Sequence, residues 1–511
     1  MENRSQWGTR AGFILAAAGS AVGLGNIWRF PATAFENGGG AFMVPYLIAL
    51  LTAGIPILIM EFTMGHKYRG SSPLSFKRMN KNTEWIGWWG VLVAFVISTY
   101  YSVIIAWAIS YSIFSFNLNW GSDPTAFLTG SYLQTAAPGE FGGFVPGVLI
   151  PLIIVWLVVL GILYRGVKKG IEIANKIFIP TLAVVFLIIV IRAITLPGAF
   201  EGLNTFFTPD FAALADPDVW VAAYGQIFFS MSIAFAIMIT YASYLPRKSD
   251  ITNNAFIVGF GNSSFELLCG IGVFSVLGFM AVGQGVGVNE VVEGGVGLAF
   301  MVFPSIINEF PALNELFGFL FFASLVLAGM SSLISIIETY VSGLSDKFKI
   351  SRQKAVVFGG GFAALVSLIF ATRGGLNFLD AADYFINQFG VAALGLVQVV
   401  AVAWFLRKLN DLKSHANEIS DIKIGPWWNI SLMFITPVVL GYNMFQLLRQ
   451  NLLQQFETDT GNYANYPDTF ILYGGWFVAG GALLVGIIMT LIKWKGSNKT
   501  DSKTENTEEA K

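Results

Sequence analysis

Long apolar runs alternate with short polar segments along most of this chain. A helix that crosses a lipid bilayer needs roughly 20 predominantly apolar residues, and about twelve stretches meet that requirement. These stretches are 10–36, 40–65, 87–116, 146–163, 168–194, 219–244, 254–283, 313–345, 354–371, 378–406, 427–450 and 468–494. Several are longer than a straight crossing needs, so tilted or interrupted helices are expected. The pattern predicts an all-α integral membrane protein.

The composition agrees with this prediction. Of the 511 residues, 55% are hydrophobic and 12% are charged, whereas soluble domains carry about 25% charged residues. The net charge of -1 argues against nucleic acid as a partner. Cys269 is the only cysteine, which excludes a disulfide framework or a cysteine metal site. The two histidines, His66 and His415, lie in charged, loop-like sequence and far apart, so they suggest no common site.

Positive charge marks alternate loops. Lysine and arginine gather in the N-terminal segment and after the second, fourth, sixth, eighth and tenth apolar runs, while the loops between are acidic or neutral. Cytoplasmic loops of membrane proteins are enriched in Lys and Arg, so both termini are predicted to be cytoplasmic. The polar tail after Lys495 is predicted to be disordered.

The first apolar run contains a cluster of glycines near its middle. Gly19, Gly23 and Gly25 precede Asn26. Each glycine costs about 1 kcal/mol relative to alanine in a helix interior, and backbone groups freed by a break must line a protein or water cavity. The segment therefore fits an unwound helix. It fits equally well a small-residue packing face, because Gly19 and Gly23 are four residues apart.

A second candidate break lies at 229–236 in the sixth run. It contains Ser230 and Ser232 but no glycine. The two segments occupy corresponding positions of two five-helix halves, which is the arrangement of inverted-repeat transporters. In such transporters unwound carbonyls bind cations and helix N-termini face anionic groups. The shared placement favours a break in both runs.

Polar side chains also lie within the apolar runs, where ionisable groups usually mark functional sites. Arg29 follows the first candidate break and needs a carboxylate partner, for which Asp383 is a candidate and Asp380 a competitor. Asn262 and Glu266 are four residues apart, on one face of the seventh helix. Hard cations such as sodium prefer oxygen donors. The runs offer such donors at Asn26, Ser230, Asn262, Ser331 and Ser332.

Several segments form long, specific motifs. They are Trp7, 19–31 (Gly-Ser-Ala-Val-Gly-Leu-Gly-Asn-Ile-Trp-Arg-Phe-Pro), 36–42 (Glu-Asn-Gly-Gly-Gly-Ala-Phe), 225–232 (Gly-Gln-Ile-Phe-Phe-Ser-Met-Ser), 240–244 (Thr-Tyr-Ala-Ser-Tyr), 262–266 and 328–332 (Ala-Gly-Met-Ser-Ser). This set resembles the signature of the neurotransmitter:sodium symporter family. The resemblance runs from about Trp7 to the twelfth apolar run.

The resemblance implies a LeuT-like five-plus-five inverted repeat with broken first and sixth helices, in a multi-pass protein of the bacterial inner membrane. The expected parts are a cytoplasmic N-terminal segment at 1–9, helices 1–5 at 10–200, helices 6–10 at 201–410, helices 11–12 at 411–495 and a cytoplasmic tail at 496–511. The implied activity is the import of a neutral amino acid with sodium by alternating access.

The resemblance also implies the residues of each site. The first sodium site would use Ala21, Asn26, Ser230, Asn262 and the substrate carboxylate. The second would use Gly19, Val22, Ala328, Ser331 and Ser332. The substrate pocket would be lined by Ser20, Ala21, Leu24, Gly25, Ile97, Tyr101, Phe229, Ser230, Ser232, Phe235, Ser332 and Ile336. Tyr101 would bind the substrate carboxylate and Phe229 would cap the pocket. The outer gate would be Arg29 with Asp383, and the inner latch Arg4 with Asp346.

Two residues narrow the implied chemistry. Monoamine-transporting members carry an aspartate at the position of Ser20, so a neutral Ser20 implies an amino acid, which brings its own carboxylate. Chloride-dependent members carry a small hydroxyl residue at the position of Glu266, so a fixed carboxylate implies chloride independence. A buried carboxylate near a cation can take up a proton when that cation leaves, so proton counter-transport through Glu266 is a further hypothesis.

The substrate side chain is the least determined part. Ala234 and Ala236 stand where many relatives have glycines, and with Ile97 their methyl groups are expected to narrow the pocket. This favours an aliphatic substrate such as alanine, methionine or leucine, with an aromatic amino acid as the alternative. A proton-coupled relative of the same fold is the other alternative, although it would usually carry a basic residue at the second sodium site. A channel would need a continuous polar pore and an enzyme a catalytic constellation, and the sequence shows neither.

Overall fold

Helices make up nearly all of the regular structure in a computed structural model that describes residues 4–454 and 466–495. Within these ranges the chain forms no strand, only two isolated bridges, Gly39 with Pro209 and Phe144 with Thr372. The first half contains α1 (Arg10–Ala21), α2 (Leu24–Trp28), α3 (Phe30–Glu36), α4 (Met43–Ala49), α5 (Ile55–Tyr68), α6 (Ser72–Met79), α7 (Glu84–Phe114), α8 (Pro124–Ala126), α9 (Pro146–Tyr164), α10 (Glu172–Ile194) and α11 (Ala199–Phe207).

The second half follows the same pattern of long and short helices. It contains α12 (Pro217–Ser230), α13 (Ile237–Ala242), α14 (Ile251–Gln284), α15 (Gly295–Gly297), α16 (Phe303–Asn308), α17 (Asn314–Phe348), α18 (Arg352–Ala355), α19 (Gly361–Ser367), α20 (Gly375–Phe385), α21 (Ala393–Val400), α22 (Leu409–Ile419), α23 (Pro426–Ile430), α24 (Thr436–Arg449), α25 (Asp468–Ile471) and α26 (Phe477–Leu491).

Ten continuous helical stretches of the described residues are long and apolar enough to cross a membrane. They are Gly40–Tyr68, Lys81–Asn117, Pro146–Tyr164, Val167–Ile194, Ile251–Gln284, Asn314–Phe348, Arg352–Ala371, Gly375–Phe405, Pro426–Leu452 and Asp468–Leu491. The first predicted span is an eleventh, bent by 54° between Arg10–Ala21 and Leu24–Glu36. The sixth is divided into α12 and α13 by six non-helical residues, 231–236. The predicted all-α membrane fold with broken first and sixth helices is confirmed.

The hydropathy pattern missed the shorter elements. The helix α11 and the apolar stretch Gly295–Asn308 lie in segments expected to be loops. Gly295–Asn308 is too short to cross a bilayer, so no span-length criterion could detect it. The placement of the two histidines in loops was also wrong, because His66 is a buried residue in the last turn of α5 and His415 lies within α22.

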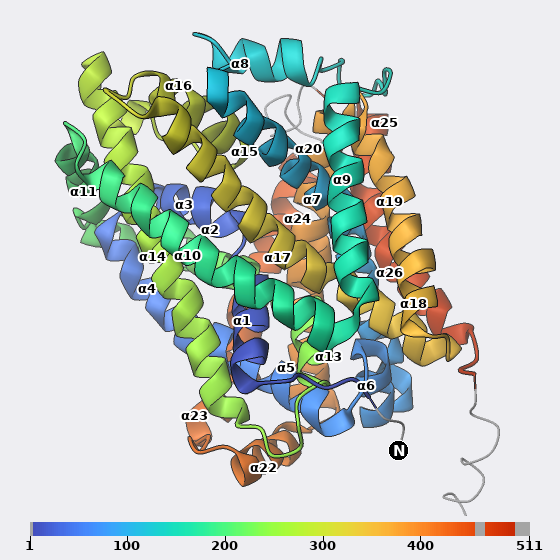
Figure 1. The fold of residues 1–511 in the computed structure, drawn as a ribbon. Coiled ribbons are helices and arrows are strands. Elements are labelled where there is room, and N and C mark those ends of the chain that lie inside the picture. Colours follow the sequence, from blue (N-terminus) through green and yellow to red (C-terminus); the bar gives the residue numbers. More distant parts are fainter. Residues whose placement is uncertain (1–3, 455–465, 496–511) are drawn as a thin grey trace, which may run out of the picture.

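The interrupted helices lie inside the bundle. Figure 1 shows α1 and α13 surrounded by long helices, with α22 and α23 at the end that carries the N-terminus and α8 at the other end. We call these ends the N-terminal face and the opposite face. The buried core contains all of α2 and α13, whereas outward positions of α9 and α10 expose large apolar side chains such as Leu157 and Val184. Non-helical backbone is thus enclosed by protein, as a membrane requires.

Candidate functional site

The break in the first helix is extended and held by a side chain. α1 ends at Ala21, and Gly23 is extended (φ -122°, ψ -168°) before α2 begins. The amide of Gly23 donates to Asn26 Oδ1 at 2.9 Å, which satisfies a group that the missing helical turn leaves without a partner. A Cβ on Gly23 would lie 3.1 Å from Ser332 Oγ and 3.3 Å from Tyr101 Oη. A side chain at this position would therefore crowd two polar side chains.

The break in the sixth helix has a different conformation. Ser232, Ala234 and Ala236 have φ values of 51°, 72° and 71°, in the left-handed region, which costs a residue other than glycine roughly 1–2 kcal/mol. Hydrogen bonds hold the segment in place: Ser232 Oγ donates to the carbonyl of Ser20 at 2.7 Å, and the amide of Ala234 donates to Glu61 Oε1 at 2.9 Å. The two breaks are therefore bonded to one another directly.

The methyl groups of Ala234 and Ala236 point away from the cavity. A Cβ on Gly395 would lie 3.3 Å from the Ala234 methyl, and a Cβ on Gly90 would lie 3.4 Å from the Ala236 methyl. Neither alanine lines the cavity described below. The expectation that these methyls narrow the substrate pocket is wrong, because a left-handed residue directs its Cβ to the other side of the backbone from a helical one. Glycines on α7 and α21 leave room for them.

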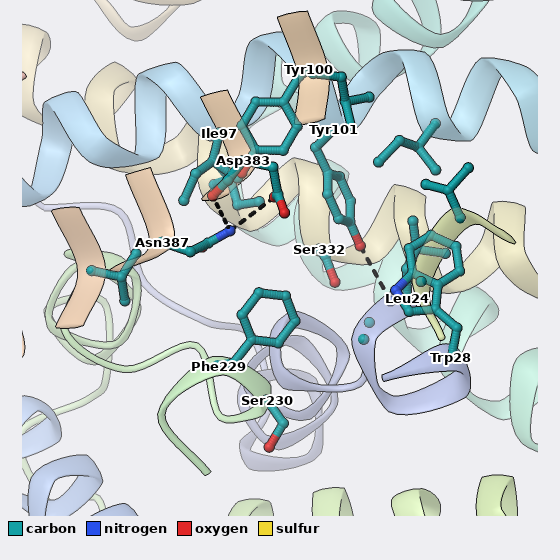
Figure 2. A pocket seen from close by; sticks show the side chains of 18 of the residues that line it. Leu24, Trp28, Ile97, Tyr100, Tyr101, Phe229, Ser230, Ser332, Asp383 and Asn387 are labelled. Carbon is teal, nitrogen blue, oxygen red and sulfur yellow. Dashed lines mark hydrogen bonds between the residues drawn. The ribbon is translucent and has the colours of Figure 1, made fainter. Parts of the chain in front are cut away.

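A cavity of about 550 Å³ lies where the two breaks meet. All twelve residues expected to line a substrate pocket line this cavity. Figure 2 shows Tyr101 directed at the backbone of Leu24, whose amide lies 3.4 Å from the Tyr101 hydroxyl, with Ser332 and Phe229 nearby. Further lining residues that the sequence did not single out are Trp28, Tyr100, Ile104, Gly294, Gly295, Val296, Leu376, Asn377, Leu379, Asn387, Val391 and Tyr466.

Oxygen donors expected at the first sodium site lie within hydrogen-bonding distance of one another. Asn26 Nδ2 donates to Asn262 Oδ1 at 2.8 Å, and Asn262 Nδ2 donates to Ser230 Oγ at 3.1 Å. These three side chains are almost fully buried, and Ala21 ends α1 next to them. The set fits a hard cation, since every candidate ligand is an amide, hydroxyl or carbonyl oxygen.

The donors expected at the second site form a separate group. Ser332 Oγ lies 3.3 Å from the carbonyl oxygen of Gly19 and 3.2 Å from that of Ser20. Ser331 Oγ donates to the carbonyl of Ala328 at 2.9 Å. Val22 follows the last residue of α1 and is not helical. This group also contains only oxygen donors from α17 and the end of α1, so it too suits sodium.

Glu266 lies on α14 at the centre of a hydrogen-bonded network and is fully buried. Its Oε1 accepts from Gln226 Nε2 at 2.5 Å, and its Oε2 accepts from the Tyr46 hydroxyl. Asn262 Nδ2 is 3.5 Å from Oε2, which connects Glu266 to the first group of oxygen donors. The sequence predicted the carboxylate but not Tyr46 or Gln226, because nothing in the local sequence indicates that three different helices meet here.

The ion pair expected as the inner latch is present. Arg4 Nη1 lies 3.0 Å from Asp346 Oδ2, and Arg4 also donates to Ser243 and Ser342. Burial lowers the pKa of Arg4, but Asp346, Tyr244 and Glu338 together outweigh burial and the net shift of this pKa is upward. Trp7 is buried beneath this pair, with its indole N–H bonded to the carbonyl of Tyr241 at 2.9 Å.

The opposite end of the cavity differs. The guanidinium of Arg29 lies 4.5 Å from the centre of the Phe229 ring, and in the described parts of the chain it forms no ion pair with Asp383. Asp383 instead accepts from Asn387 Nδ2 at 2.8 Å (Figure 2). Asp380 and Asp383 both line the cavity, which therefore continues from the two breaks to residues near the opposite face.

The sequence matches a family model described as the sodium:neurotransmitter symporter family over residues 4–140 and 140–496. The chain belongs to this family. It is similar to an uncharacterized sodium-dependent transporter of Methanocaldococcus jannaschii, with 41% identity over 491 residues that cover 96% of this chain and 98% of the relative. A human sodium- and chloride-dependent taurine transporter is 30% identical over a match that covers 87% of this chain and 78% of the human protein.

A solved structure supports the same assignment. The crystal structure of MhsT in complex with L-phenylalanine matches with a TM-score of 0.74 and 32% identity, covering 87% of this chain and 99% of MhsT. The protein is therefore a sodium-dependent membrane transporter of the symporter family with a LeuT-like fold, and its relatives are transporters rather than enzymes.

Proposed function

We propose that this symporter couples the import of a neutral amino acid to two sodium ions, without chloride, with both termini in the cytoplasm. The observation that carries the proposal is the cavity at the meeting point of the two breaks, where oxygen donors suited to cations lie beside uncharged lining residues such as Ser20, Tyr101 and Ser332. A neutral Ser20 lines this pocket beside the first break, so this position supplies no carboxylate for a substrate amine. A substrate with its own carboxylate fits this chemistry.

The pocket offers groups for both charges of an amino acid. The Tyr101 hydroxyl can donate to a carboxylate that also contacts a sodium ion beside Asn26 and Asn262. Carbonyls at the ends of α1 and α12 can accept from the ammonium group, since helix C-termini carry partial negative charge. Sodium then helps to bind the substrate, and the substrate helps to bind sodium, which is the basis of coupling.

Chloride independence is proposed from Glu266. The human taurine transporter described above is called sodium- and chloride-dependent, and so is a human GABA transporter 2 that is 30% identical to this chain. In this chain a fully buried carboxylate is bonded by Tyr46 and Gln226 next to Asn262. A fixed negative charge there can balance the first sodium ion. Exchange of Glu266 for serine should make uptake depend on chloride, and uptake by this variant that is unchanged between chloride and gluconate would contradict the assignment.

The substrate side chain has two candidates. An aliphatic amino acid suits the wall that Ile97 and Ile336 contribute. An aromatic amino acid is the second candidate, because MhsT was solved with L-phenylalanine bound. The methyls of Ala234 and Ala236 do not decide between them, since they lie outside the lining.

Alternating access provides the cycle. The pair of Arg4 and Asp346 closes the N-terminal face, while Arg29 is held over Phe229 and the cavity continues toward the opposite face. The arrangement suits loading from the opposite face. Formation of an ion pair between Arg29 and Asp383 would close that side, and separation of Arg4 from Asp346 would open the other.

Uptake of labelled amino acids into proteoliposomes tests the proposal. A panel of aliphatic, aromatic, acidic and basic amino acids is presented with an inward sodium gradient, and in parallel with choline in place of sodium. We expect uptake of one or more neutral amino acids only with sodium. Uptake that is undiminished in choline would contradict sodium coupling, and uptake of charged amino acids alone would contradict the substrate class.

A further inference from the structure

The only two histidines of the chain are in direct contact at the N-terminal face. His66 Nδ1 lies 2.9 Å from His415 Nε2, and the two ring centres are 5.2 Å apart. His66 belongs to the last turn of α5 and is buried, while His415 belongs to α22 and is half-buried. Two imidazoles from distant parts of the sequence therefore meet at a place that solvent can reach.

A backbone carbonyl fixes the orientation of His66. Its Nε2 lies 2.9 Å from the carbonyl oxygen of Pro246, which belongs to the segment that follows α13. A carbonyl only accepts hydrogen bonds, so Nε2 carries the hydrogen and the neutral ring presents the Nδ1 lone pair toward His415. Histidines that bind metals commonly donate their other N–H to a carbonyl in this way, which sets the tautomer and the ring orientation.

The surroundings keep His415 available as a ligand. Burial, followed by the positive charge of Lys67, lowers the pKa of His415 and so favours the neutral imidazole, while Asp411 and Glu418 on the same helix oppose this shift. Asp411 precedes His415 by one helical turn and forms an ion pair with Lys67. The bond to Lys67 lowers the pKa of Asp411, which keeps this side chain a carboxylate one helical turn from His415.

We propose that His66 and His415 form a binding site for a late first-row transition-metal ion such as Zn²⁺. Imidazole nitrogen is a preferred ligand of these ions. Tetrahedral zinc with Zn–N bonds of about 2.0–2.1 Å holds its nitrogens about 3.3 Å apart, so the two rings must separate only slightly from 2.9 Å. Water and, by exchange with Lys67, the carboxylate of Asp411 complete the shell.

The site is a regulatory rather than a structural one. The described residues contain no ready-made group of three or more His, Cys, Asp or Glu side chains around a metal position, and structural zinc sites have four protein ligands. A bound ion would connect α5 and the segment after α13 to α22. If the chain transports by the cycle proposed above, such a brace should slow that cycle. The effect on transport rests on the proposed function, but metal binding does not.

Calorimetric titration of the purified full-length protein with ZnCl₂ at neutral pH tests the site. We expect one zinc ion per chain in the wild type and in the matched control Ser414→Ala, which changes an exposed neighbour on α22. His415→Gln and His66→Gln should bind more than about tenfold more weakly, since loss of even an outer-shell partner costs 10–100-fold. Binding should also weaken toward pH 5, because both imidazoles must be deprotonated.

If His66→Gln does not fold, His415→Gln still decides the test, because His415 is half-buried and its replacement should leave the fold intact. Equal zinc affinity in the wild type and in His415→Gln would overturn the proposal, as would the absence of binding in the wild type. In proteoliposomes, zinc added on the N-terminal face should slow uptake by the wild type and not by His415→Gln. A protein that binds zinc through these histidines but shows no sodium-driven uptake would leave the metal site standing and contradict the proposed function alone.

Discussion

The two helix breaks border the same cavity but are built from opposite kinds of sequence. The first contains glycines, yet its backbone at Gly23 is extended, a conformation open to any residue. Its glycines provide space: a Cβ on Gly25 would lie 2.3 Å from Phe229 Cε1. The second break contains no glycine, yet Ser232, Ala234 and Ala236 are left-handed. The glycines of the first break therefore mark a place where other groups approach the backbone closely. At the second break, unusual dihedral angles occur without any glycine to indicate them.

What stabilises each break also differs. The first is held mainly from within, because Asn26 bonds to the amide of Gly23 three residues earlier. The second is held from outside, because Glu61 on α5 accepts from both the amide of Ala234 and the side chain of Gln398. The first break is thus encoded locally, and the second depends on partners distant in the sequence.

The largest effect on transport and stability is expected when Glu61, the distant partner of the second break, is replaced. Glu61→Leu should abolish uptake and lower the melting temperature, since each buried polar group left without a partner costs about 1–3 kcal/mol. The matched variant Glu61→Gln keeps an acceptor oxygen and should retain most of the thermal stability. Melting followed by tryptophan fluorescence measures both. Equal melting temperatures for Glu61→Leu and the wild type would show that the sixth break does not need its distant partner.

A large effect on transport, with a smaller one on stability, is expected at the first break. Gly25→Ala should push the Phe229 ring out of place and so reduce uptake more than tenfold, the effect of about 1.4 kcal/mol on the barrier. Gly480→Ala is the control, because a Cβ there meets nothing within 4 Å. Normal uptake by Gly25→Ala would mean that the glycines of the first break are not required for space.

A moderate effect is expected when an alanine of the second break is replaced by glycine. The change in stability should differ in sign from that of an ordinary helical alanine. Ala234→Gly relieves the left-handed strain of roughly 1–2 kcal/mol. Glycine also makes the unfolded chain more flexible, which lowers the stability by about 0.4–1 kcal/mol. The variant should be as stable as the wild type or slightly more so. Ala49→Gly, in the interior of the continuous helical stretch Gly40–Tyr68, should lose about 1 kcal/mol. Chemical denaturation of the two variants compares them, and a loss of equal size in both would contradict left-handed strain at Ala234.

The smallest effect is expected at Ser230, the proposed sodium ligand at the end of α12. Ser230→Thr keeps the hydroxyl that Asn262 bonds, so the sodium concentration that gives half-maximal uptake should change little. Ser230→Ala removes the oxygen and should raise that concentration. A threonine variant as impaired as the alanine variant would show that the shape of the side chain, rather than its oxygen, matters at this position.

The parts that the sequence could predict are those encoded in local patterns. Apolar length located the spans, and the motif around Gly23 and Asn26 located the first break. The pocket residues followed from a family resemblance, and all of them line the cavity. The direction of the Ala234 and Ala236 methyls could not be predicted, because it follows from dihedral angles that alanine rarely adopts.

Contacts between distant helices were also beyond prediction. The bonds from Tyr46 and Gln226 to Glu266, and from Gln398 to Glu61, join residues that no local pattern pairs. The same reason explains why the two histidines were interpreted as unrelated. Long-range polar contacts depend on how helices pack, and one sequence without its fold does not specify that packing.

The single thiol of the chain has a consequence for redox behaviour. Cys269 is fully buried on α14, and oxidants and metal ions act on accessible thiolates. A protein that is exposed on both sides of a membrane meets a reducing cell interior and a more oxidising exterior. With no second cysteine to pair with and no access to the first, this chain keeps one covalent form in both environments. Oxidative damage should therefore affect its methionines rather than Cys269.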